Sequence, residues 1–119
     1  MPVVLPRIAD AEPPTDTLHD WAVFEVLIPE LGEPTVHVVG YIRCDGEGRA
    51  LSPVQGFDSV TRCVATRSGS VYRLAGIPGM SSDAEYVWSR WRRLWSVTVL
   101  EDRTRWLRAE FVAAEVQRA

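Results

Sequence analysis

Three arginines close together, Arg90, Arg92 and Arg93, form with Tyr86 the set of residues best suited to binding chemistry. Guanidinium groups make planar, bidentate contacts with carboxylates and phosphates, and an aromatic ring can stack on a flat partner. The set suits a protein surface or nucleic acid, but the chain's net charge of -3 disfavours nucleic acid. We predict that the set contacts a protein. The alternative without function is a solvated helix face paired with acids of the same chain.

A second candidate contact is the acidic turn that holds Asp45 and Glu47. It belongs to an acidic half: residues 1–58 carry ten acids against three arginines (net -7), and residues 59–119 carry six acids against ten arginines (net +4). Either the halves complement each other inside one fold, or an acidic face is offered to a basic partner. Carboxylates in turns commonly make local hydrogen bonds, so we do not expect acid–base catalysis here.

Signatures of catalysis, metal binding and phosphate binding are missing from the sequence. His19 and His37 lie far apart and lack metal-ligand spacing with Cys44 and Cys63, and no phosphate-binding glycine motif occurs. We therefore predict a non-enzymatic protein without cofactor or metal. Two cysteines are too few for a disulfide framework, so free thiols are favoured, although a Cys44–Cys63 bridge stays open. With no apolar run of about 20 residues and no leader pattern, we expect a cytoplasmic protein without membrane contact.

The element that must position the arginines is an amphipathic helix over about Ser82 to Trp95. Ser82 as N-cap and Glu85 three residues later form a capping box. At 100° per residue, one arc collects apolar residues and the opposite arc collects the arginines. The apolar arc contains Ala84, Val87, Trp88, Trp91, Leu94 and Trp95. We predict that this stripe is buried as a whole, which leaves function to the arginine-rich face.

Strand-like segments account for most of the remaining chain. Trp21–Ile28 and Thr35–Arg43 are rich in β-branched residues, and Gly40 predicts a bulge or bend. Thr35–Arg43 pairs with residues 49–54 in one predicted hairpin; Ser59–Thr66 and Ser70–Leu74, joined through Gly69, form a second. Residues 96–100 and 105–112 favour a third, although Leu107, Phe111 and Ala114 would also align on a helix, so residues 105–117 stay open between strand and helix.

These elements predict an irregular arm over residues 1–18 and one globular α+β domain over residues 19–119. The domain is expected to be a small, strongly bent antiparallel β-sheet or partly closed barrel of about six strands, packed against one amphipathic α-helix.

The function that this sequence favours is a protein-binding domain that occupies a surface of a larger protein or complex. Every basic residue is arginine, which is typical of GC-rich genomes. Small acidic proteins of GC-rich bacteria, their phages and mobile elements have this character, and inhibitors of bacterial defence are among them. The alternative is a β-barrel that binds a small ligand or nucleic acid, and self-association through the helix, giving a homodimer, also stays open.

Overall fold

Strand β1 (Asp16–Leu27) organises the fold, because it pairs with three other strands. The computed structural model describes residues 3–118. In this part of the chain β1 pairs antiparallel with β2, parallel with β6 over Asp16–Leu18, and antiparallel with β7 over Phe24–Leu27. The strand order is β3-β2-β1-β6-β5-β4, with β7 on β1.

The other elements follow β1 in the chain as six further strands and two helices. Their bounds are β2 Pro34–Ile42, β3 Glu47–Ala50, β4 Val54–Asp58, β5 Cys63–Thr66, β6 Val71–Leu74, α1 Ser82–Leu94, β7 Thr98–Asp102 and α2 Thr104–Arg118. Two predicted hairpins are confirmed, β2 with β3 and β5 with β6. Gly69 between β5 and β6 has a positive φ of 93°, which glycine adopts without strain.

The α+β class is confirmed, but three details of the predicted architecture are wrong. The sheet is mixed, because β1 and β6 run parallel. It is not closed into a barrel, since the strand path ends at β3 and at β4. The residues that the structure describes also form two long helices, so α1 is not the sole helix. A sequence pattern indicates that a segment is extended. Whether its partner strand runs parallel or antiparallel depends on the connection between the two strands, which the pattern does not show.

The sheet bends sharply where β1 passes from β6 to β2. Asp20 has a φ of +47°, and the β1–β2 register shifts between His19 and Ala22. The irregularity predicted at Gly40 is present, but the extra residue lies in the partner strand β1. A Cβ on Gly40 would lie 3.0 Å from the Leu18 Cβ, so glycine permits an approach that a larger residue would allow only if Leu18 shifted.

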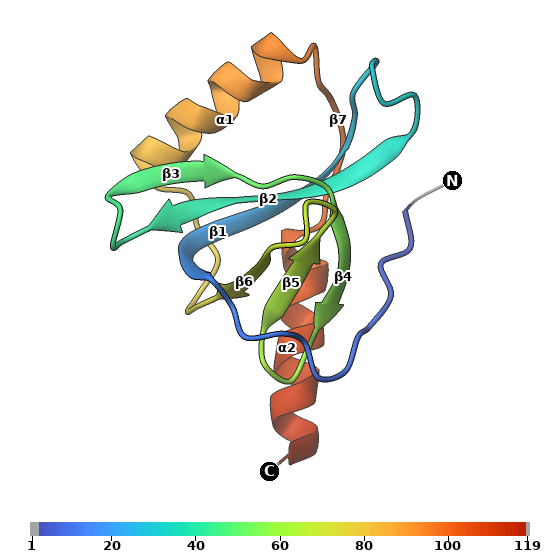
Figure 1. Cartoon of the computed structure of the whole chain (residues 1–119), viewed down its shortest axis with the longest axis vertical. Coiled ribbons are helices and arrows are strands. Elements are labelled where there is room, and N and C mark those ends of the chain that lie inside the picture. Colours follow the sequence, from blue (N-terminus) through green and yellow to red (C-terminus); the bar gives the residue numbers. More distant parts are fainter. Residues whose placement is uncertain (1–2, 119) are drawn as a thin grey trace.

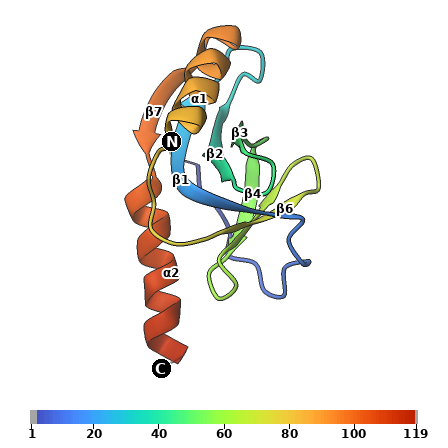
Figure 2. The ribbon, with the colours of Figure 1, turned by 90° about the vertical axis from the view of Figure 1, so that its left-hand side faces the viewer.

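Two apolar clusters lie on opposite faces of β1 and β2. The ribbon shows α1 beside β1, β2 and β3 at one end of the molecule and α2 at the other end (Figures 1 and 2). The larger contains Trp21, Val23, Val36 and Val38 together with side chains of β4, β5 and α2. The smaller lies under α1 and contains Val26, Ile28, Val39, Ala84 and Trp88. The central strands are therefore buried on both faces, which explains their nearly continuous apolar sequence.

The predicted third hairpin is wrong, because residues 104–118 form helix α2. Residues 98–102 do form a strand, but β7 pairs with β1, more than 70 residues earlier in the chain. The Asp102 carboxylate accepts from the Thr104 N–H at the start of α2. Leu107 and Phe111 are then buried in the larger cluster, and the Phe111 ring lies 5.8 Å from that of Trp21. Burying this apolar stripe favours a helix over an additional edge strand.

The segment before β1 is tied to the body of the molecule. The Ile8 N–H donates to the Phe57 carbonyl at 2.8 Å, which covers part of the β4 edge. The Arg103 guanidinium donates to the Val3 carbonyl and to the buried Glu25 carboxylate, both at 2.9 Å. Residues 3–15 thus include irregular but anchored chain, and the last three residues of the predicted arm, Asp16–Leu18, already belong to β1.

The two cysteines are unpaired: Cys44 is exposed in the turn after β2, and Cys63 is buried in β5. The disulfide that the sequence left open is therefore not formed. Over residues 3–118, neither helix has the length and apolar character that crossing a bilayer requires.

Candidate functional site

Helix α1 packs closely on the sheet at its N-terminal end. Ser81, not Ser82, is the N-cap: its Oγ accepts from the Ala84 N–H at 3.1 Å. Gly48 of β3 faces this first turn, and a Cβ there would lie 2.6 Å from the Ala84 backbone. Adjacent serines are both good caps, so the position where the helix meets β3 decides which of them starts it.

The C-terminal end of α1 is packed less deeply, so the predicted continuous buried stripe is wrong in its last turn. Trp88 is buried and Trp91 half-buried, and their rings stack at 5.2 Å. Leu94, however, is 74% exposed, and Trp95, the C-cap, is 39% exposed. In Figure 1 this end of α1 rises away from β2 and β3. Periodicity predicts which residues share a face, but it does not show how far the sheet extends beneath that face.

A groove of about 350 Å³ opens where α1 and the sheet diverge. Trp91 and Trp95 form one wall of the groove, and His37 also lines the groove. The opposite side is formed by Ile28, Glu30 and Leu31 of the β1–β2 connection and by residues 50–53, Ala50 to Pro53. Two of the lining apolar side chains are partly exposed, Leu31 at 42% and Trp95 at 39%. Such a concave, mainly apolar surface is typical of a binding site.

His37 is buried in this groove as a neutral ring. Its Nδ1 lies 2.8 Å from the Leu51 carbonyl, which can only accept, so Nδ1 carries the proton. Its Nε2 then accepts from the Thr35 hydroxyl at 2.8 Å. Burial lowers the pKa of His37 below its usual value and outweighs the Leu51 hydrogen bond, and the Arg67 cation acts in the same direction as burial. Both ring nitrogens are occupied, and the ring packs against Trp91 at 4.8 Å.

The structure brings Tyr86, Arg90 and Arg93 together on the exposed face of α1, next to Leu94. The Arg90 guanidinium donates to the Tyr86 hydroxyl at 3.1 Å and lies over its ring at 5.8 Å. Arg92 lies on another flank, 6.0 Å from the Trp88 ring. Among the residues that the structure describes, no carboxylate lies within 4 Å of these three arginines. The three arginines therefore make no ion pair with acids of the described chain.

Asp45 in the β2–β3 turn and Glu47 at the start of β3 lie apart from this set. Both carboxylates contact the Arg49 guanidinium, at 3.4 and 2.6 Å. The turn adjoins the first turn of α1 through Gly48, whereas Arg90 and Arg93 lie in its second half. The acidic turn thus has a cation of its own, and the six predicted contact residues do not form one surface patch.

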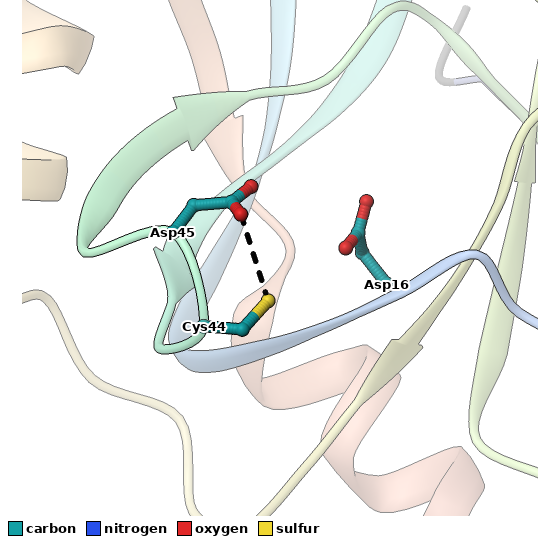
Figure 3. Close-up of side chains that lie close together, drawn as sticks. All are labelled: Asp16, Cys44 and Asp45. Carbon is teal, nitrogen blue, oxygen red and sulfur yellow. Dashed lines mark hydrogen bonds between the residues drawn. The ribbon is translucent and has the colours of Figure 1, made fainter.

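A small cluster of possible metal ligands lies beside that turn (Figure 3). Asp16, Cys44 and Asp45 each bring one ligand atom within 4.8 Å of the others, and the Cys44 thiol donates to Asp45 at 3.7 Å. Arg49 also contacts Asp16, at 3.6 Å, so it compensates both carboxylates. Desolvation and the neighbouring carboxylates of Asp45 and Asp16 raise the pKa of Cys44. The cluster is explained without a cation.

Sequence reasoning missed the groove, and with it the roles of Leu31 and His37. Leu31 lies in a turn and His37 in a strand, and neither position has a local signal for binding.

Comparison of the chain with protein-family models, with curated proteins and with solved structures finds no match.

Proposed function

We propose that this chain is a non-enzymatic, cytoplasmic protein-binding domain that contacts an acidic surface of a larger protein through α1. The observation that carries the proposal is the exposed C-terminal half of α1, where the unneutralised Arg90 and Arg93 adjoin the exposed Leu94 and Trp95. Tryptophan, tyrosine and arginine dominate the energetics of protein interfaces. An exposed apolar patch with a charged rim is typical of such a surface.

The charge of this face favours a partner rich in aspartate and glutamate. Three guanidinium groups without nearby carboxylates in the described chain are free to make bidentate contacts. Nucleic acid offers the same negative charge, but the acidic N-terminal half, net -7, opposes a polyanion at longer range. Inhibition of a bacterial defence complex, as by a phage or mobile-element protein, is the specific form of this proposal; the partner's identity would test it.

The experiment is capture of partners from the native host by the tagged full chain. The test variant is R90E/R92E/R93E, and the matched control is R73E/R105E/R108E, which changes the net charge equally on β6 and α2. We expect the wild type and the control to recover the same stoichiometric protein, and the test variant to lose it. Unfolding midpoints would verify that both variants are folded.

Undiminished capture by R90E/R92E/R93E would refute the proposal. So would recovery that disappears after nuclease treatment, since that result would assign the arginine face to nucleic acid.

A further inference from the structure

The groove beside Trp95 is the remaining feature of this surface that the arginines do not explain. Its volume of about 350 Å³ lies at the lower end of the range for ligand sites, which suits one bulky side chain. The polar atoms of His37 are already used by Thr35 and Leu51, so the imidazole offers the groove only its apolar surface. An apolar occupant therefore fits the groove better than a polar one.

The arginine face and the groove are adjacent on the same helix. Arg90 and Leu94 are four residues apart and share one face, while Trp91 and Trp95, each one position further, line the groove. A segment whose apolar side chain enters the groove would therefore have its neighbouring residues beside Arg90 and Arg93. Charge complementarity makes those neighbours acidic.

Glu30 gives the occupant a direction. This exposed glutamate lines the groove from the β1–β2 connection, so it repels carboxylates near that connection. In the bound segment, acidic residues next to the apolar residue are favoured where they lie near α1. They are disfavoured where they lie near the β1–β2 connection.

We propose that the groove receives one aromatic or large aliphatic side chain from an acidic segment of the partner protein. This inference rests on the proposed function. Arg90 and Arg93 bind the carboxylates that flank this side chain on one side. Trp95 and Leu31 form the apolar mouth of the groove and decide which side chain is accepted. The arginines supply attraction, and the groove supplies specificity.

The experiment selects peptides from a displayed random 12-residue library on the immobilised full chain and measures their affinities as fluorescein-labelled synthetic peptides. We expect enriched peptides to combine a Trp, Phe or Leu with acids on one side. Trp95→Ala and Leu31→Ser should each weaken binding by about tenfold or more, as for interface anchors. Leu100→Ala, which truncates a similarly exposed apolar residue on β7, is the control and should change affinity less than about twofold.

The outcomes separate this inference from the proposed function. Peptides that depend on Arg90 and Arg93 but are indifferent to Trp95→Ala and Leu31→Ser would overturn the groove assignment and leave the proposed function standing. Peptides indifferent to both sets would overturn both, and so would tighter binding of a labelled single-stranded DNA. Enrichment of basic peptides, of a peptide matching this chain's own sequence, or of none above background would also overturn the groove assignment.

Discussion

At the scale of single residues, the groove depends on a histidine whose charge state is set by its surroundings. The His37 ring is fully enclosed, and it holds a donor and an acceptor in place only as the neutral Nδ1–H form. Protonation would put a second N–H on Nε2, which would turn the Thr35 hydroxyl from donor to acceptor, and it would bury a charge. The residue therefore links the stability of the groove to pH.

We predict that the free energy of unfolding decreases as the pH falls below about 6.5. Because the pKa of His37 is lowered in the folded protein, the unfolded chain binds its proton first, and stability present above pH 6.5 is lost at lower pH. One proton gives a slope of at most about 1.4 kcal/mol per pH unit. Urea unfolding at several pH values between about 5.5 and 8 measures how the free energy of unfolding depends on pH.

The control for this prediction is His37→Asn, which keeps an N–H donor but does not titrate in this range. It should be less stable than the wild type at pH 8 and should lose most of the slope. His19→Asn, at a half-exposed position, should retain the wild-type slope. A slope that persists in His37→Asn would assign the pH dependence to another group.

At the scale of elements, the contact between α1 and β3 decides how the helix lies on the sheet. Gly48 allows the helix backbone to approach at Ala84, while the other end of α1 diverges and leaves the groove. The close contact is between backbones, so a side chain inserted there cannot be relieved by a change of rotamer.

We predict that Gly48→Ala lowers the free energy of unfolding by about 1–3 kcal/mol, the usual cost of overpacking. Its added Cβ would lie 2.6 Å from backbone atoms of α1, which forces the helix outward. Gly79→Ala is the matched control, because its Cβ would meet atoms only at 3.5 Å or beyond. Denaturant unfolding followed by tryptophan fluorescence measures both. Equal losses for the two variants would contradict the role given to Gly48.

At the scale of the whole molecule, the two oppositely charged halves of the chain are partly joined by ion pairs. Glu25 pairs with Arg103 in the interior at 2.9 Å, and Glu33 pairs with Arg67 at the surface at 3.9 Å. The halves thus complement each other at these two pairs, whereas Arg90, Arg92 and Arg93 make no ion pair in the part of the chain that the structure describes. Backbone hydrogen bonds of Pro6 and Ile8 with Phe57 hold the N-terminal segment against β4, and Arg7 pairs with Glu110 of α2 at 2.8 Å.

We predict that removing residues 1–9 destabilises the protein and promotes association. Leu5 is buried in the larger cluster, and the Pro6 carbonyl accepts from the Phe57 N–H of β4 at 3.1 Å. Without this cover, the β4 edge offers unpaired backbone groups to another chain. Sedimentation velocity over a range of concentrations should show more association than for the full chain.

Leu5→Ala separates the two effects of this deletion. It should cost about 2–5 kcal/mol through the lost apolar contact, without new association, because the backbone cover of β4 remains. If the shortened chain associates no more than Leu5→Ala, the segment contributes core packing and does not protect the edge.

Local features were predictable from the sequence because they depend on neighbouring residues. Ser81–Ser82 and the apolar repeat from Ala84 to Trp91 specify α1, and the loops at Gly46 and Gly69 specify two hairpins. The arginine-rich face follows from the same repeat, since a helix separates its two arcs wherever it lies. Cys44 and Cys63 are free thiols, as the low number of cysteines in the sequence favoured.

Only the tertiary structure decided the partners of each element and the depth of its burial. The edge of β1 opposite β2 pairs with β6 at one end and with β7 at the other. Because β7 pairs with β1, it forms no hairpin with the segment after it, and that segment forms α2. The divergence of α1 from the sheet exposed Leu94 and Trp95 and opened the groove over His37. These outcomes depend on packing between residues far apart in the chain. A sequence alone thus determined which face of α1 carries charge, and the fold determined where that charge meets an apolar site.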